Sequence, residues 1–375
     1  TGAFPNDFRR DSVADELQSA YGAHSPEVLE TDSPSARVAG RMMAKRVMGK
    51  ASFVKVQDQS GQIQLFIERD GVSPEVYQSF KSWDVGDIVG ASGILFKTKT
   101  GELSIRVDEL RLLVKSLRPM PEKWHGISDQ EFKLRRRYVD LMVSKDTRRV
   151  FATRTEIVRF VRSFLDALGF AEVETPMMHP IPGGALAKPF STHHNALDIP
   201  LFLRVAPELY LKRLLVGGLE RVYEINRSFR NEGISTQHSP EFTMLELYQA
   251  YATHEDLLGL TETLIREAAR LVLGTDQVVY QGKSFDLEGA FAVLTVEEGL
   301  LRHNSELRSG IRDIDCLRHI CGQKGIKYKL EHGAGKLQIE LFERTVEQHL
   351  IGPTFVTQFP TEVSPLARRN DDDPF

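Results

Sequence analysis

Residues 221–251, RVYEINRSFR NEGISTQHSP EFTMLELYQA Y, decide the fold of the larger part of the chain. Residues 221–229 and 241–251 are each predicted to form a strand. The stretch between them, 230–238, is polar and rich in residues that favour loops. The sequence therefore predicts an antiparallel hairpin with a long loop, and long ordered loops tend to carry function.

The second strand of this hairpin places Phe242, Met244, Glu246 and Tyr248 on one face. A carboxylate among apolar and aromatic neighbours is costly to bury unless it meets a cation. The four steps from Phe242 to Glu246 span about 13 Å, which is room for a stacked base at one end and an ammonium group at the other. Arg230, at the start of the loop, is placed to hold a phosphate between them.

A helix is predicted upstream of the hairpin. Thr153 and Glu156 have the spacing of a capping box, and Gly169 is placed to end the helix before an extended segment, 170–175. An apolar stripe at helical intervals predicts a buried face: Ile157, Phe160, Val161, Phe164, Leu165 and Leu168.

A second helix start follows an apolar strand at 201–205. Pro207 suits the first turn of this helix, and Glu208 lies where the helix dipole favours a carboxylate. Helix capping alone therefore explains Glu208 as well as a binding role does.

Residues 36–116 consist of short alternating segments punctuated by glycine, which indicates an all-β domain. Its length fits a five-stranded barrel of the oligonucleotide-binding type, with a hairpin turn at 97–101. The segment 117–146 has the prolines and basic run of a connector, 1–35 precedes the barrel, and 147–375 forms the second domain.

One face of the predicted barrel has the composition of an RNA-binding surface. Val54 and Val56 point to one side of their strand and Phe53 to the other, while Gln64 and Phe66 lie opposite an apolar face on the next strand. Aromatic rings among amides and cations suit base stacking and base-edge hydrogen bonds. The alternative is a second protein layer over the rings. Between Asp32 and Asp58 every charged residue is basic: Arg37, Arg41, Lys45, Arg46, Lys50 and Lys55.

Other features exclude several classes of protein. No apolar run is long enough to span a membrane, and the first residues do not resemble a secretion signal. The two cysteines, Cys316 and Cys321, form neither a disulfide framework nor a zinc site. His193 and His194 have no third metal ligand nearby. No Walker-type or dinucleotide-binding glycine loop is present, so a nucleotide is expected on the hairpin.

These residues resemble the class II lysyl-tRNA synthetases, and the resemblance covers nearly the whole chain. In the barrel it rests on the blocks at 39–43, 48–54 and 97–104. In the second domain it rests on blocks at 173–178, 181–185, 206–212, 229–233 and 240–243. It implies an α+β domain built on an antiparallel sheet that carries the active site, preceded by a barrel that binds the anticodon.

The resemblance also implies roles for single residues. For ATP it implies Arg230 as the catalytic residue on the α-phosphate and Phe242 on adenine, with Glu232 and His238 lining the site. For lysine it implies Gly184, Glu208, Glu246 and Tyr248. For the anticodon it implies Arg46, Phe53 and Gln64. Two acidic residues suit a cationic amino acid and would repel aspartate.

The reaction that the resemblance implies uses ATP and Mg²⁺ to form lysyl-adenylate and then charges tRNA(Lys), with no covalent enzyme intermediate. It further implies a cytoplasmic homodimer formed through residues 169–178, with no membrane association.

The sequence departs from the family pattern in two places. Gln237 stands where the family usually has arginine, which removes a partner of the triphosphate. The chain ends at Phe375, ahead of the family's metal-binding carboxylates and third motif, so we expect an incomplete copy with no metal ligands of its own. A non-catalytic tRNA-binding relative and a ligase for another substrate are the alternatives.

Overall fold

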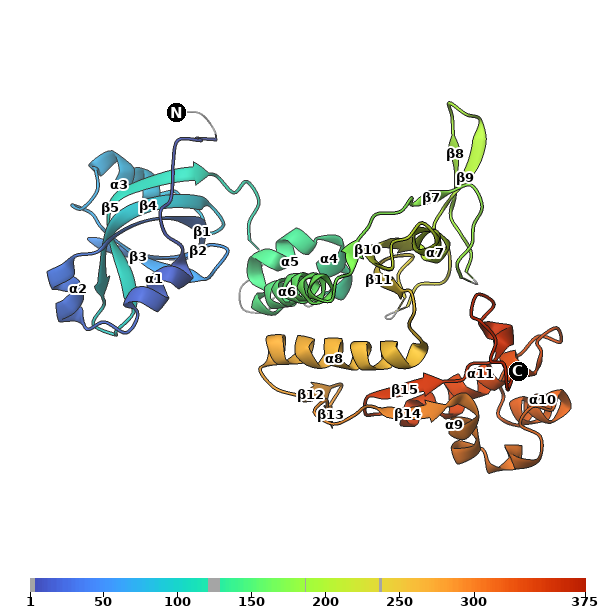
Figure 1. Cartoon of the computed structure of the whole chain (residues 1–375). Helices are drawn as coiled ribbons and strands as arrows, with labels where there is room; N and C mark the ends of the chain where they lie inside the picture. The colour runs from blue at the N-terminus through green and yellow to red at the C-terminus, as the bar shows by residue number, and fades with distance from the viewer. Residues whose placement is uncertain (1–3, 121–128, 186, 236–237) are drawn as a thin grey trace. The chain divides into compact units, whose positions relative to one another are not determined.

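The computed structural model describes residues 4–120, 129–185, 187–235 and 238–375. The chain forms two compact units, residues 1–148 and 149–375 (Figure 1). No helix in the described residues is long and apolar enough to cross a membrane.

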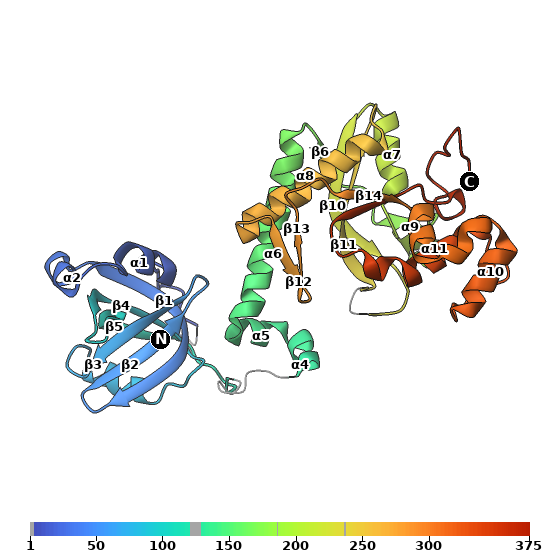
Figure 2. The same ribbon diagram turned by 90° about the horizontal axis from the view of Figure 1, so that it is seen from below.

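The first unit is built on a closed five-stranded barrel, as predicted (Figure 2). The strands pair in the order β1-β2-β3-β5-β4, and only the β3–β5 pair is parallel. Their bounds are β1 Ser35–Met48, β2 Ala51–Gln57, β3 Gln62–Glu68, β4 Ile88–Lys97 and β5 Leu103–Val114. The predicted hairpin turn joins β4 to β5, where Lys97 pairs with Leu103.

Alternation along the strands produces the barrel core. Val54, Val56, Ile63, Leu65 and Ile67 are at most 3% exposed. Three short helices flank the barrel strands in the chain: α1 Ala14–Tyr21, α2 Pro26–Asp32 and α3 Pro74–Lys81. Because one face of β2 and β3 fills the core, the polar and aromatic side chains of these strands lie on the other face.

Two helices lie in the segment predicted as a connector: α4 Gln130–Arg135 and α5 Arg137–Val143. The buried Asp140 carboxylate accepts hydrogen bonds from Arg137 Nη1 at 2.7 Å and Thr147 Oγ1 at 2.9 Å. The bounds of the connector, residues 117 and 146, remain a prediction.

The long helix α6, Lys145–Ala167, begins two turns before the predicted capping box. The prediction of a start at Thr153 is therefore wrong. The Ser144 hydroxyl accepts a hydrogen bond from Thr147 N at 3.1 Å, so an earlier residue caps the helix. Gly169, with φ of +78°, follows its last turn as predicted.

A three-stranded sheet in the order β11-β10-β6 forms the centre of the second unit. Strand β10, Arg221–Phe229, pairs antiparallel with β11, Glu241–Gln249, which confirms the predicted hairpin. The short β6, Ala171–Glu172, runs parallel to β10. One face of this sheet packs against α6, with Leu165, Phe170 and Tyr223 at the centre of the cluster. Leu168, predicted to be buried with the stripe, is 40% exposed because the helix has ended.

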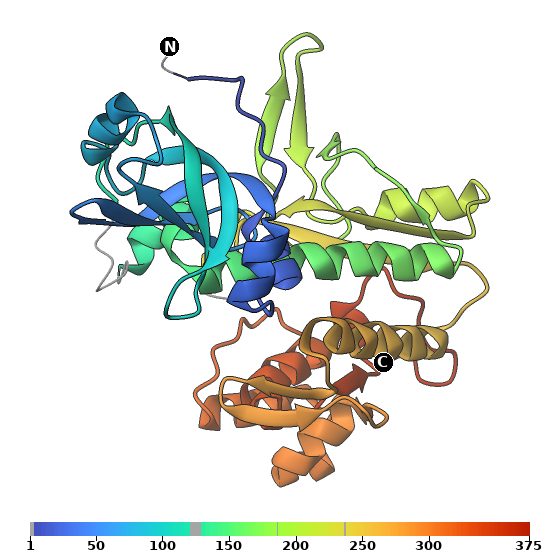
Figure 3. The same cartoon turned by 90° about the vertical axis from the view of Figure 1, so that its left-hand side faces the viewer.

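Further strands and helices precede and follow β10 and β11 in the sequence. Three strands make a separate small sheet in the order β7-β9-β8, and its β8–β9 hairpin projects from the second unit (Figures 1 and 3). These elements are β7 Met178–His179, β8 Ser191–His194, β9 Ile199–Leu203, α7 Glu208–Val216 and α8 His254–Leu273.

A second hydrophobic cluster lies in the last part of the chain, around helices α9–α11 and the parallel pair β14–β15. The elements of this cluster are α9 Val296–His303, α10 Ile314–Gln323, α11 Ala334–Thr345, β14 Ala292–Thr295 and β15 Thr354–Thr357. A hairpin precedes them in the chain and consists of β12 Gln277–Tyr280 and β13 Lys283–Asp286. Three short 3₁₀ helices lie at Ser305–Ser309, Glu347–His349 and Thr361–Val363. Cys321 is buried in this cluster, and burial raises the pKa of its thiol to about 11. Both cysteines are free thiols.

Candidate active site and candidate nucleic-acid interface

The register of β11 places the predicted substrate-binding side chains on one face. Leu245 and Leu247 pack into the cluster under α6. Since successive side chains alternate, Phe242, Glu246 and Tyr248 lie on the opposite face, as predicted from the sequence. Helix α7 packs against β10 and β11.

At one end of this face, Arg230 and Phe242 lie together. The Arg230 guanidinium lies 5.2 Å from the centre of the Phe242 ring. The backbone N–H of Arg230 donates to Pro240 O at 2.8 Å, which fixes the arginine where the strand leaves the sheet. Its buried Nε has no hydrogen-bond partner among the described residues. A buried guanidinium N–H without an acceptor marks this end as a site for an anion.

At the other end, Glu246 and Tyr248 are half-buried, and the Tyr248 hydroxyl donates to Glu246 Oε2 at 3.3 Å. Burial raises the pKa of Glu246, and the nearby Glu208 carboxylate raises it further. The pKa of Tyr248 is also raised, first by burial and then by the charges of Glu246 and Glu208. Glu246 forms no ion pair among the described residues, so a cationic ligand would relieve its partly desolvated negative charge.

Glu208 is the first residue of α7, as predicted. Its carboxylate accepts a hydrogen bond from Lys212 Nζ at 2.7 Å, one helical turn away. The same ammonium lies 6.0 Å from the centre of the Tyr248 ring. Lys212 was not predicted as a site residue, although its spacing from Glu208 is that of a helical ion pair.

Gly184 has a φ of +95°, a conformation that side chains other than glycine rarely adopt. A Cβ at this position would lie 3.2 Å from Ala206 Cβ, two residues before Glu208. The glycine therefore allows its loop to approach the start of α7 closely.

Glu232 and His238 lie in the hairpin loop and are exposed. Glu232 Oε1 accepts from Lys188 N at 3.4 Å, and His238 Nδ1 lies 2.9 Å from Ser235 Oγ. The Glu232 backbone N–H donates to Arg230 O at 2.9 Å, whereas the side chains of Glu232 and His238 contact loop residues. Gln237 lies outside the described residues.

A buried ion pair, which was not predicted, supports the sheet below these residues. Arg204 and Glu224 are each 1% exposed, and Arg204 Nη1 donates to Glu224 Oε1 at 2.8 Å. Thr175 Oγ1 accepts from Arg204 at 2.9 Å and donates to Glu224 Oε2 at 2.7 Å. Arg204 Nε donates to Arg227 O at 2.8 Å, and Arg204 O accepts from Phe229 N at 2.9 Å. Because Phe229 precedes Arg230, this network fixes the backbone that carries the anion-binding arginine.

The two adjacent histidines of the β8–β9 hairpin are exposed. His193 Nε2 lies 3.1 Å from Asp198 Oδ1, and His194 Nδ1 accepts from Leu197 N at 3.2 Å. Within the described residues, no three His, Cys, Asp or Glu side chains are grouped to hold a metal ion.

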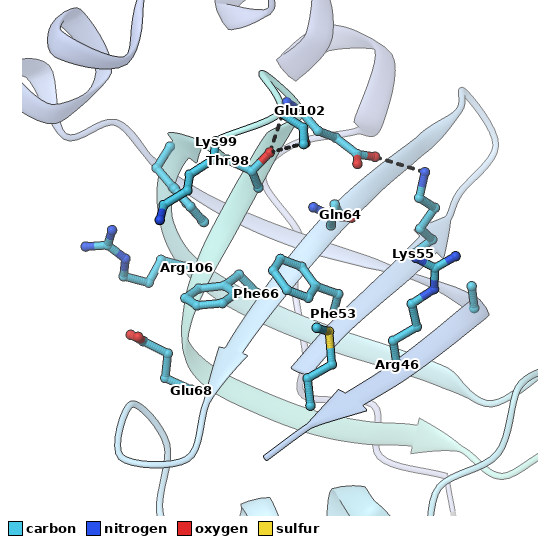
Figure 4. A pocket seen from close by; sticks show the side chains of 14 residues that line it. Arg46, Phe53, Lys55, Gln64, Phe66, Glu68, Thr98, Lys99, Glu102 and Arg106 are labelled. Carbon is cyan, nitrogen blue, oxygen red and sulfur yellow. Dashed lines mark hydrogen bonds and ion pairs between the residues drawn. The ribbon is translucent and has the colours of Figure 1, made fainter. Parts of the chain in front are cut away.

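The barrel carries a separate open cavity of about 810 Å³ (Figure 4). Arg46, Phe53, Gln64 and Phe66 line it, so the barrel unit brings together the three predicted anticodon-binding residues. Both rings are half-buried and face the cavity instead of lying under a second layer of this unit. Gln64 is only 8% exposed, and its Nε2 donates to Ser104 Oγ at 3.0 Å.

The cavity combines aromatic rings with charges at its edge. The ring centres of Phe53 and Phe66 lie 5.1 Å apart. Lys55 Nζ forms an ion pair with Glu102 Oε1 at 2.9 Å, and both residues line the cavity (Figure 4). Stacking surfaces beside cations are the features that single-stranded nucleic acids require.

Comparison with known proteins agrees with this arrangement. Residues 129–374 match the family model "tRNA synthetases class II (D, K and N)", and residues 36–113 match "OB-fold nucleic acid binding domain". The lysine–tRNA ligase of Thioalkalivibrio sulfidiphilus is 59% identical over 374 residues, which cover 100% of this chain and 75% of that protein. The lysine–tRNA ligases of Xanthomonas oryzae pv. oryzae and Yersinia enterocolitica are 56% and 55% identical, and the matches cover 99% and 100% of this chain and 74% of each relative. The chain therefore belongs to the class II tRNA synthetases, and within them to the lysine–tRNA ligase family.

Proposed function

We propose that this chain activates lysine with ATP and transfers it to tRNA(Lys), with the barrel binding the anticodon. The observation that carries the proposal is the β11 face, which has Arg230 and Phe242 at one end and Glu246, Tyr248 and Glu208 at the other. We assign anticodon binding to residues 36–116 and catalysis to 147–375, with 117–146 as the connector and 1–35 as the N-terminal segment.

In the first step, an oxygen of the lysine carboxylate bonds to the α-phosphorus of ATP. The bond from that phosphorus to the bridging oxygen breaks, and pyrophosphate leaves with the electron pair. The unpartnered Arg230 Nε–H and the rest of its guanidinium meet the developing charge on the α-phosphate. Phe242 stacks against adenine. The Arg230 guanidinium and the centre of the Phe242 ring lie 5.2 Å apart, so the two side chains are already in contact with each other.

Lysine is oriented by its side-chain ammonium. Glu246 and Glu208 supply two carboxylates, and the Tyr248 hydroxyl fixes the first of them. Gly184 lines the entry to this pocket, and Glu232 and His238 approach the nucleotide from the loop. In the second step a terminal ribose hydroxyl of the tRNA attacks the lysyl carbonyl carbon, the bond from that carbon to the phosphate oxygen breaks, and AMP leaves with the electron pair and takes up the hydroxyl proton. Positioning of the reactants supplies much of the rate.

Magnesium accompanies the triphosphate of ATP. Within the described residues no three His, Cys, Asp or Glu side chains are grouped to hold a metal ion, and Mg²⁺ on a triphosphate needs only one or two protein carboxylates beside the phosphates.

We also propose a homodimer formed through residues 169–178, in the cytoplasm. Support comes from Met178, a large apolar side chain at the end of this segment that is 55% exposed. Replacing Met178 with Asp should shift a dimer to monomer in sedimentation velocity. A wild-type chain that sediments as a monomer over the same concentration range contradicts this assignment.

The function is tested with Glu246→Gln in lysine-dependent ATP–pyrophosphate exchange. Glu241→Gln is the matched control, because Glu241 lies on the same strand but is exposed and 3.5 Å from Arg227. Glu246→Gln should abolish lysine-stimulated exchange and Glu241→Gln should leave it within about fivefold, since surface ion pairs contribute about 0–1 kcal/mol. Equal effects of the two substitutions would remove the basis of the assignment.

A further inference from the structure

Four side chains form a row across the barrel face. Arg46 of β1 pairs in register with Phe53 of β2, Phe53 with Phe66 of β3, and Phe66 with Arg106 of β5. Neighbouring strands lie about 4.8 Å apart, so the row is about 14 Å long. Of the three anticodon residues assigned above, Arg46 and Phe53 lie in this row, and Gln64 lies on β3 two residues before Phe66.

The other end of the row continues the aromatic surface. Phe96 of β4 lies with its ring centre 5.5 Å from that of Phe66. The Arg106 guanidinium lies 5.0 Å from the centre of the Phe96 ring. Gly93 permits this arrangement, because a Cβ there would collide with the Arg106 carbonyl oxygen where β4 crosses β5. A guanidinium held against a ring presents its other face to a base, and bases stack on such planes.

The charges favour a nucleic acid at both ends. In the described part of the chain, neither Arg46 nor Arg106 forms an ion pair with a carboxylate, whereas Lys55 is neutralised by Glu102 at 2.9 Å. Both arginines line the cavity, and Figure 4 shows them on opposite sides of the two labelled rings. Two unneutralised guanidinium groups therefore flank a continuous stacking surface.

We propose that Phe96 and Arg106 form a further base-binding position, which takes an unpaired nucleotide adjoining the three anticodon bases. This inference rests on the proposed anticodon-binding role of the barrel. Barrels of this type accommodate about 4–16 nucleotides, so a site longer than three bases fits the fold.

The test uses fluorescence anisotropy of the full chain with RNA stem–loops at one fixed salt concentration. One loop carries UUU, which pairs with the lysine codons, and a second carries GUC. Two further UUU loops have an abasic nucleotide directly before or directly after the triplet. The variants are Arg106→Gln and Phe96→Leu, and Arg69→Gln is the control, because it removes the same charge from an exposed barrel residue that does not line the cavity.

Arg106→Gln and Phe96→Leu should each weaken binding to the UUU loop about 10-fold, the effect of losing one stacked base, and Arg69→Gln should weaken it less than about threefold. One of the two abasic loops should weaken wild-type binding by a similar factor and Arg106→Gln binding hardly at all. Affinities of Arg106→Gln equal to those of Arg69→Gln, or abasic penalties unchanged in Arg106→Gln, would overturn the inference while the anticodon assignment stands. A wild-type chain that does not distinguish UUU from GUC would overturn the anticodon assignment and this inference with it.

Discussion

Replacing Glu224 with Gln should destabilise the second unit strongly. Glu224 and Arg204 are each 1% exposed and bonded at 2.8 Å, with Thr175 completing the network. The substitution keeps the shape of the side chain but leaves the Arg204 charge buried without a counter-ion. Removing one partner of a buried pair costs about 3–5 kcal/mol. In a unit the size of residues 149–375 each kcal/mol lowers Tm by about 2–4 °C, so the expected decrease is roughly 6–20 °C.

The assay is thermal unfolding followed by far-ultraviolet circular dichroism, with Asp371→Asn as the control. That substitution removes a carboxylate 2.7 Å from Arg368, but the two side chains are 77% and 78% exposed, so the expected change in Tm is under about 4 °C. The double variant Arg204→Met, Glu224→Leu should recover much of the loss, because it buries no charge. A Tm of Glu224→Gln equal to that of Asp371→Asn would refute the reasoning about the buried pair.

Three further predictions concern the active site. Because burial raises the pKa of Glu246, lysine affinity measured by isothermal titration should be weak below that raised pKa and should strengthen as pH rises through it. The same raised pKa means that the contribution of Glu246 to folding stability, measured by thermal unfolding, should fall as pH rises from the ordinary Glu range through the raised pKa. Glu246→Gln should remove both pH dependences. Gly184→Ala forces a side chain into a φ of +95° and should lower the free energy of unfolding by about 1–3 kcal/mol in chemical denaturation. Gly233→Ala, with open space around its Cβ, should lower it by under about 1 kcal/mol. Equal losses of unfolding free energy in the two variants would contradict the role of Gly184. Arg230→Gln should lower kcat for exchange about 10²–10³-fold with little change in the KM for lysine, and a change confined to KM would place Arg230 outside the transition state.

Local periodicity was enough to predict the hairpin and its functional face. A period of two depends only on neighbouring residues, so the position of Glu246 opposite Leu245 and Leu247 could be derived before any tertiary contact was known. The same reasoning separated Phe53 from Val54 in the barrel.

Features that depend on tertiary pairing could not be predicted in this way. Arg204 and Glu224 lie in different strand regions, and nothing local shows that they meet. Arg106 joins Phe66 only through the parallel β3–β5 pair, which links strands distant in the chain. The start of α6 was misplaced because two residues with capping-box spacing lie inside a helix that Ser144 caps earlier.

Lysine-stimulated ATP–pyrophosphate exchange tests the central claim most directly. It should be measured on this chain and, because the chain spans 75% of the Thioalkalivibrio relative, on this chain extended to the full length of that relative. The account predicts that the extended protein exchanges with lysine and not with aspartate or asparagine, and that Glu246→Gln abolishes the exchange in the same background. Exchange stimulated by aspartate, or no exchange with lysine in the extended protein, would contradict the assignment of the β11 face to a cationic amino acid.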